Sequence, residues 1–177
     1  MSARLPHSVD PWRLAGQGGV ISGEVPLDAL QRVADLLLQR SGNVEFDFRF
    51  SKDDNGRILI DGLVRADLVI QCQRCLEAMT LVVDASPQLA VIETAAEADR
   101  IPEACDPVFA EAGSLSIVDL IEDELLLAIP QVPMHAESDC EVDLASISDP
   151  PPEQSENEAK TENPFAALSA LRTEREN

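Results

Sequence analysis

Two runs of alternating apolar and polar residues, joined by a tight turn, constrain the fold of this chain most strongly. In the first run, NVEFDFRF, four apolar side chains alternate with polar ones: Val44, Phe46, Phe48 and Phe50. This period of two is typical of a strand with one buried face. The turn DDNGR offers Asn55 and Gly56, which tolerate positive φ, and a return strand runs from Arg57 to Ile70. The pattern predicts a β-hairpin.

Two further strand-like runs follow, TLVVD after Met79 and the segment Leu89 to Glu93. They place the stretch QCQRCLE at the tip that joins two strands. Cys72 and Cys75 therefore stand close together on one tight turn.

Two segments have the apolar spacing of helices. The first runs from Pro26 to Gln39, with Pro26 suited to the first turn and with one apolar stripe: Leu27, Leu30, Val33, Ala34, Leu37 and Leu38. The second is SLSIVDLIEDELLLAIP, which Ser116 can cap and Pro130 ends. Its buried stripe is expected to be Ile117, Leu120, Ile121 and Leu125.

A run of acids at the middle of the second helix, Glu122, Asp123 and Glu124, is typical of a solvated face. Together, the elements predict an α+β domain over residues 1 to 145, in which an antiparallel sheet of about four to six strands is covered by two helices.

The cysteine turn has three interpretations. Cys72 and Cys75 can join His135 and Cys140 in a Cys3His zinc site, because C-x2-C with a second ligand pair is typical of structural zinc. They can also be unligated thiols or a redox pair. Redox chemistry is disfavoured, since low-pKa thiols usually lie at a helix N-terminus, although Arg74 could lower the pKa of a thiol here.

The charge of the chain favours a basic partner. There are 13 Lys and Arg against 33 Asp and Glu, and residues 91–177 hold 4 of the basic and 21 of the acidic side chains. Such a field repels phosphate backbones and attracts cationic protein surfaces. Aromatic residues make up only 3% of the chain, so few side chains are available to stack on bases. RNA contact is expected to be indirect or weak.

The sequence does not predict an enzyme. Neither His7 nor His135 is accompanied by a GxSxG elbow, an HExxH motif or a P-loop. No segment approaches the ~18 consecutive apolar residues of a membrane helix, and no signal peptide is apparent. We expect a soluble, cytoplasmic protein without membrane contact, in which cysteines stay reduced.

The end of the chain is predicted to be a short helical motif on a flexible tether. Residues 146–162 are rich in Ser, Asp, Glu and Pro, a composition that predicts a disordered acidic linker. Residues 163–177 follow as a short amphipathic helical segment that begins NPFAALSALR. So short a helix needs a surface to fold on, and its own domain or a partner could supply one.

Several of these stretches resemble one known family. CQRCLEAM, PEACDPVFAEAGSLSIVDLIEDELLLAIPQVPMH with its following DC, and NPFAALSALR are similar to the bacterial large ribosomal RNA subunit accumulation protein family, YceD, and span residues 72–172. The resemblance implies a non-enzymatic role in the synthesis, processing or stability of 23S ribosomal RNA. Some branches of the family carry a second CxxC cluster near the place where this chain has His135 and Cys140.

The resemblance also implies a set of partner-binding positions. They are Arg74 in the turn, Glu122, Asp123 and Glu124 on the helix, and Asn163, Pro164, Phe165, Leu168 and Leu171 in the tail. Residues and resemblance together predict a ribosome-biogenesis factor that contacts a basic protein, such as a ribosomal protein or an rRNA-processing factor. Two alternatives remain, an RNA-binding zinc knuckle that uses Arg57, Arg65 and Arg74, and a thiol oxidoreductase.

Overall fold

The computed structural model describes residues 8–140. The chain divides into two units, residues 1–142 and 143–177, and all the described residues lie in the first. The predicted acidic linker (146–162) and tail motif (163–177), with the tail positions expected to bind a partner, lie outside the described residues. Those expectations stay predictions.

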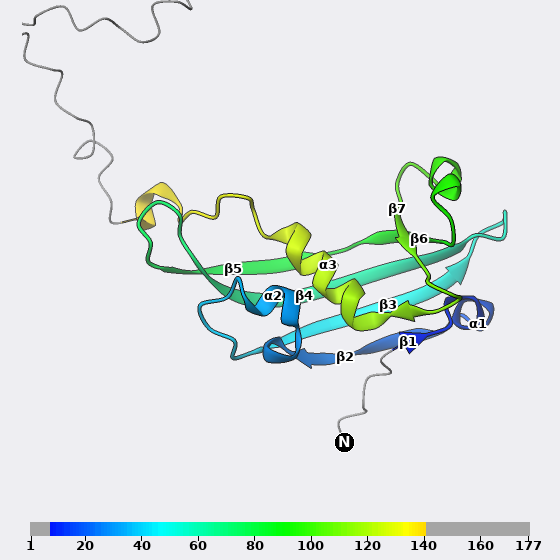
Figure 1. Ribbon diagram of the computed structural model, residues 1–177, viewed down its shortest axis with the longest axis horizontal. Coiled ribbons are helices and arrows are strands. Elements are labelled where there is room, and N and C mark those ends of the chain that lie inside the picture. Colours follow the sequence, from blue (N-terminus) through cyan, green and yellow to red (C-terminus); the bar gives the residue numbers. More distant parts are fainter. Residues whose placement is uncertain (1–7, 141–177) are drawn as a thin grey trace, which may run out of the picture. The chain divides into compact units, whose positions relative to one another are not determined.

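A six-stranded sheet forms the body of the described part (Figure 1). Its strands are β2 (Val20–Pro26), β3 (Asn43–Lys52), β4 (Ile58–Gln71), β5 (Ala78–Ala85), β6 (Gln88–Ile92) and β7 (Asp106–Phe109). The strand order is β2-β3-β4-β6-β7, and β5 pairs with a second stretch of β4. All neighbours are antiparallel except β6 and β7, which are parallel. The predicted α+β class and the hairpin of β3 and β4 are confirmed.

The long strand β4 organises the sheet, because it pairs with two different strands along one edge. Its residues 58–61 lie opposite β6, and its residues 64–71 lie opposite β5. Gly62 stands between these two stretches, where its backbone N–H donates to the carbonyl oxygen of Pro87 at 2.8 Å. β5 and β6 are both antiparallel to β4, so the chain continues past Pro87 in the same direction along this edge.

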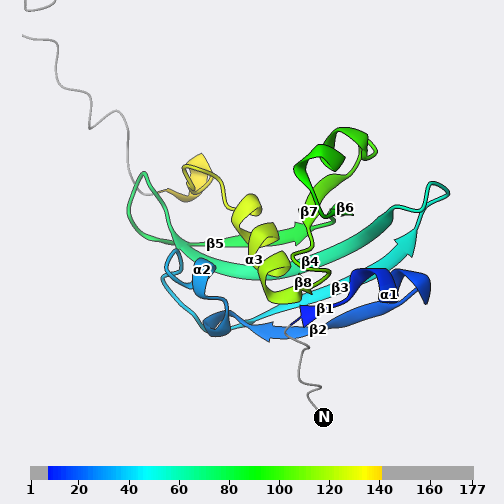
Figure 2. The same cartoon turned by 45° about the vertical axis from the view of Figure 1, so that its right-hand side comes forward.

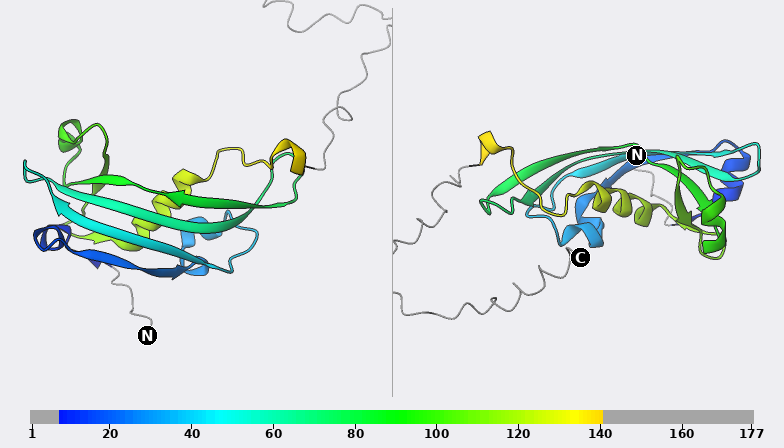
Figure 3. Two further views of the ribbon diagram at one scale, coloured as in Figure 1. Left: turned by 180° about the vertical axis from the view of Figure 1, so that it is seen from behind. Right: turned by 90° about the horizontal axis from the view of Figure 1, so that it is seen from above.

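Helical elements cover one face of the sheet and leave the other face open (Figure 3). The main cover is α3 (Ile117–Ala128), which crosses the strands as Figure 2 shows. The other elements are short: β1 (Ser8–Val9), α1 (Pro11–Gly16), η1 (Leu27–Ala29), α2 (Gln31–Ala34), η2 (Ala95–Arg100), β8 (Leu115–Ser116) and η3 (Glu137–Asp139). β1 pairs with β8 in a separate ribbon.

The core lies between the covered face of the sheet and α3. The alternating residues of β3 and β4 enter it as predicted, among them Phe48, Phe50, Ile60 and Leu68. The α3 stripe is buried as well, and the Ser116 hydroxyl accepts a hydrogen bond from the Asp119 backbone N–H at 3.2 Å, as expected of an N-cap. The predicted helix of SLSIVDLIEDELLLAIP is therefore confirmed.

The predicted helix from Pro26 to Gln39 is wrong in extent. Pro26 belongs to β2, and the helical part is split into η1 and α2 by Leu30, which has non-helical angles of φ −94° and ψ 87°. Beyond α2, the Leu38 backbone N–H donates to the carbonyl oxygen of Val69 in β4 at 2.8 Å. Contact with the sheet edge therefore replaces the last helical turns. Of the predicted stripe, five residues are buried and Leu38 is 51% exposed.

The acidic run on α3 also differs from expectation. The solvated-face interpretation is wrong for Glu122 and Glu124, which are 4% and 9% exposed. The physical reason is that α2 and β7 flank α3, so acids beside the core stripe meet other elements rather than water. No helix within residues 8–140 has both the length and the apolar character needed to cross a membrane.

Candidate metal centre

The turn between β4 and β5 holds Cys72 and Cys75 in a compact loop. It is closed by two backbone hydrogen bonds, from the Cys72 N–H to the Glu77 carbonyl and from the Leu76 N–H to the Cys72 carbonyl, each 2.9 Å long. Leu76 adopts φ 66°, a left-handed conformation that is unfavourable for a residue with a side chain. The chain accepts this strain in the turn that brings the two cysteines together.

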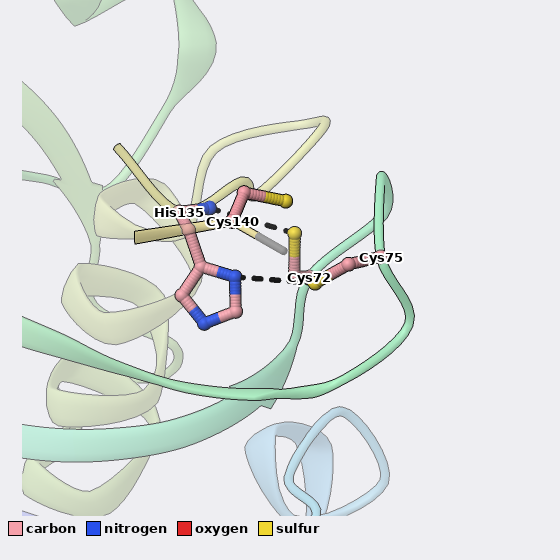
Figure 4. Close-up of side chains that lie close together, drawn as sticks. All are labelled: Cys72, Cys75, His135 and Cys140. Atoms are coloured by element: carbon pink, nitrogen blue, oxygen red, sulfur yellow. Dashed lines mark hydrogen bonds between the residues drawn. The ribbon is translucent and has the colours of Figure 1, made fainter. Parts of the chain in front are cut away.

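The segment after α3 supplies the other half of the cluster. Pro133 accepts a hydrogen bond from the Gln73 backbone N–H at 2.8 Å, which fixes this segment against the cysteine turn. His135 and Cys140 then point back toward Cys72 and Cys75 (Figure 4). The four residues were predicted to lie close together, although 60 positions separate Cys75 from His135. The structure confirms this proximity.

The four side chains have the geometry and chemistry of a metal site. Their ligand atoms, one from each residue, all lie within 4.8 Å of one another. Tetrahedral ligands about 2.3 Å from a metal stand roughly 3.8 Å apart, so a shift of about 1 Å would close the cluster around an ion. Three sulfurs and one imidazole are donors that suit a borderline-soft divalent metal. The cluster could therefore hold a metal ion.

The orientation of His135 leaves its Nδ1, which faces the cysteines, available to bind a metal. Its Nε2 lies 3.2 Å from the carbonyl oxygen of Ala78, which can only accept, so this nitrogen carries the proton in that hydrogen bond. Nδ1 is then the unprotonated nitrogen, and it faces Cys75 Sγ at 3.3 Å. A backbone carbonyl that fixes the tautomer of a histidine is a typical outer partner at a metal site.

Backbone donors prepare Cys72 to act as a thiolate. Burial works against ionisation of this thiol, but the backbone N–H groups of Cys75, His135 and Arg74 point at Sγ and lower its pKa to about 5. Two of those contacts, from Arg74 and His135, are 3.5 Å long. A thiolate is the form that binds metal, so the loop favours the ligand form at neutral pH.

The pKa values of Cys75 and His135 are also shifted by the groups around them. The Glu77 backbone N–H favours ionisation of Cys75, but burial and the neighbouring Cys72 and Cys140 outweigh it and raise the pKa of the Cys75 thiol. The pKa of His135 is also raised: burial lowers it, and hydrogen bonds to Cys72 and Cys140 raise it more. A bound cation would favour the proton-free form of all these ligands.

The same geometry weakens the redox alternative. Reactive thiolates of oxidoreductases are partly exposed, because a disulfide substrate must reach them. Cys72, whose pKa is the low one, is fully buried. Cys105 lies in the loop before β7 and is not a member of the cluster.

Arg74 belongs to the cluster rather than to an open basic surface. Its Nε donates to Cys140 Sγ at 3.0 Å, and its Nη2 donates to the His135 carbonyl oxygen at 3.0 Å. The other arginines of the RNA-knuckle alternative lie elsewhere: Arg57 precedes β4, whose 14 residues separate it from the turn by roughly 45 Å at ~3.3 Å per residue. The structure does not bring Arg57, Arg65 and Arg74 together.

The other described residues that were expected to bind a partner lie on α3. Glu122 accepts a hydrogen bond from the Arg32 backbone, and Asp123 forms an ion pair with the Arg32 side chain at 2.6 Å. Glu124 lies beside Asp106 of β7. The roles of Arg32 and Asp106 have no signal in the sequence, because each depends on contacts between distant segments. Ala78 and Pro133 act through backbone carbonyls, which no side-chain pattern reveals.

Fold and cluster together define a small α+β protein with a one-sided sheet and a Cys3His cluster at a hairpin tip. Comparison with known proteins specifies it further. The family described as "Large ribosomal RNA subunit accumulation protein YceD" matches residues 60–172. A relative of that name from Haemophilus influenzae is 30% identical over 171 residues, which cover 96% of this chain and 97% of the relative. The chain belongs to the YceD family. No solved structure matches it significantly.

Proposed function

We propose that this protein is a non-enzymatic factor that supports the accumulation of large-subunit (23S) ribosomal RNA by contacting a basic protein. The name of the family supports the first part. The observation that carries the second part is the charge of the open sheet face. Six carboxylates lie on it: Glu24, Glu45, Asp47, Asp61, Asp67 and Asp84.

The two arginines on this face offset only part of its charge. Arg49 forms an ion pair with Asp47, and Arg65 forms one with Asp84. Residues 8–140 as a whole carry 24 acidic and 9 basic side chains, and five of the nine are in ion pairs. A surface of this kind repels the phosphates of RNA and attracts a cationic protein. Ribosomal proteins or rRNA-processing factors of basic charge are partners of this chemistry.

We also propose that the cluster holds zinc in a structural role. Cys72, Cys75, His135 and Cys140 form a Cys3His set, which is typical of closed structural zinc sites with no position for a substrate. When bound, zinc would supply a cross-link between the β4–β5 turn and the segment after α3. The residues around it position the ligands, and none of this requires a catalytic step.

The tail is the second contact surface in this proposal. Phe165, Leu168 and Leu171 repeat at a spacing suited to one helical face. Burial of three such side chains can contribute roughly 1.5 to 3 kcal/mol each before ordering costs, enough for a micromolar contact. The tail would then fold on the partner, with Asn163 and Pro164 at its start.

The test is affinity capture of the full-length protein from cells, with and without nuclease, read by mass spectrometry. Basic proteins that stay bound after nuclease support direct protein contact. Loss of every ribosomal partner after nuclease would show that RNA mediates the association and would contradict the proposal. Depletion of the protein is expected to lower the ratio of 23S to 16S ribosomal RNA.

The tail has its own variant pair. The double change Phe165→Ala and Leu168→Ala is expected to abolish partner capture, whereas Ser169→Ala in the same segment should leave it intact. Thermal melts of both variants provide the check on folding. If the double change lowers the melting temperature of the free protein, the tail packs on its own domain and is not a recognition element.

A further inference from the structure

A cavity of about 330 Å³ lies between α3, β6 and β7. Its walls are apolar and include Leu89, Val108, Leu120 and Leu126. Three carboxylates also line it, Asp106 from β7 with Asp123 and Glu124 from α3, and so does Arg32 of α2, which is paired with Asp123. The volume is at the lower limit of ligand pockets, which range from about 300 to 1,000 Å³, so it suits one long side chain.

Glu124 is the unusual member of this cavity. It is 9% exposed, and within residues 8–140 no hydrogen bond or ion pair reaches its carboxylate. Its neighbours in sequence differ, because Glu122 accepts from the Arg32 backbone and Asp123 is paired with the Arg32 guanidinium. Burial, with Asp106 and Asp123 nearby, raises the pKa of the Glu124 carboxyl. Among the described residues no fully buried side-chain oxygen lacks a hydrogen-bond partner, so the Glu124 oxygens keep contact with the cavity, where a cation would offset the cost of their burial.

The geometry points to a binding site for one cationic side chain, an arginine or lysine of a basic protein partner, with Glu124 as its principal anchor. Asp106 would share the charge, while Asp123 keeps its ion pair with Arg32, and the leucine and valine walls would pack against the aliphatic stem of the side chain. The inference deepens the proposed function, because it names the chemical group that the basic partner inserts.

The cavity favours a side chain over a small inorganic cation. An inorganic divalent cation prefers six or more oxygen ligands, including water, whereas six of the ten residues that line this cavity are apolar. A long cationic side chain matches both parts of the site, since its stem is apolar and its head carries the charge.

The probe is the peptide acetyl-Gly-Arg-Gly-amide, titrated into the full-length protein and followed by methyl NMR at Leu89, Leu120 and Leu127. Its control is the same peptide with citrulline, which has the shape of arginine without the charge. We expect saturable shifts at these methyl groups with the arginine peptide only. Glu124→Gln should weaken binding at this site by about ten-fold, equivalent to about 1.4 kcal/mol. Asp54→Asn, which removes an exposed carboxylate from the β3–β4 turn, should change it less than about two-fold.

The variant is suited to the test because Glu124→Gln keeps the shape of the side chain and should raise, not lower, the melting temperature. Three results would overturn the inference: equal binding of the citrulline peptide, equal affinity of the Glu124→Gln variant, or arginine-dependent shifts that avoid these methyl groups. The titration needs no cellular partner. If the arginine peptide binds at the cavity but no basic protein stays bound after nuclease, only the proposed function is contradicted. If basic proteins stay bound but the peptide does not bind at the cavity, only this site is contradicted.

Discussion

The carboxylate of Glu122 on α3 accepts a hydrogen bond from the backbone N–H of Arg32 at 2.8 Å. Arg32 lies in the first turn of α2, where backbone N–H groups have no partner within the helix. One helix thus supplies the N-terminal cap of another, 90 residues away in sequence. This bond supplies the capping acceptor that α2, only four residues long, lacks in its own sequence.

Loss of this cap should destabilise the fold. Glu122→Met keeps the volume of the side chain but removes the acceptor, and the unpaired N–H should cost about 1–2 kcal/mol. Glu122→Gln retains an acceptor oxygen and should cost less than about 1 kcal/mol. Urea denaturation of the two variants provides the comparison, and equal stability of both would show that the hydrogen bond is unimportant.

Glu124 should make stability fall as pH rises. Its pKa in the folded protein is raised above the usual Glu value of 4.5 by burial, then by Asp106 and Asp123. Between the pKa of the unfolded state and the higher pKa of the folded state, the folded protein holds a proton that the unfolded chain has released. The free energy of unfolding therefore decreases as the pH rises through this window. Below about pH 4.5 the contribution is fully present.

The measurement is the melting temperature of Glu124→Gln relative to the natural protein at pH 5 and pH 8. The variant should gain more at pH 8, since it lacks the carboxyl that ionises. Asp67→Asn, at an exposed site, controls for the change in net charge. An advantage that does not grow with pH would rule out the raised pKa.

Zinc binding predicts coupled losses of metal and stability. Cys72→Ser and Cys140→Ser should each lower the zinc content below the expected one ion per chain and lower the melting temperature, because structural zinc contributes on the order of 10 kcal/mol of apparent binding energy. Elemental analysis and thermal melts are the measurements, and a chelator should reproduce the loss. Cys105→Ser, outside the cluster, should change neither quantity. If the natural protein, purified under reducing conditions without chelator, contains no metal, the zinc proposal is contradicted.

Gly62 should tolerate no side chain. A Cβ built there would lie 2.6 Å from Pro87 Cγ and 3.0 Å from Phe48 Cδ1. Gly62→Ala therefore forces the Phe48 ring or the β5–β6 junction at Pro87 to move, at a cost of about 1–3 kcal/mol. Gly16→Ala is the matched control, because nothing lies within 4 Å of a Cβ at that position. Chemical denaturation of both variants would show the difference, and similar stabilities would refute the close packing.

The sequence alone determined the elements whose signal is local. The alternation around DDNGR identified β3 and β4, and the cap and stripe of α3 were equally plain, because side-chain periodicity reflects the geometry of a single element. The spacing of Cys72, Cys75, His135 and Cys140 indicated a shared metal site as one of three interpretations, and the structure brings the four residues together. Metal ligands keep characteristic spacings even when their two halves are far apart in the chain.

Only the tertiary structure decided features that depend on contacts between distant segments. The stripe from Leu27 to Leu38 was compatible with one helix, but a hydrogen bond from Leu38 to β4 ended it early. The three acids of α3 look alike in sequence, yet one caps α2, one forms an ion pair and one is buried without a partner in the described part of the chain. The environment of a charged side chain is set by what packs against it, and the neighbours of α3, Arg32 and Asp106, come from segments that local pattern cannot place.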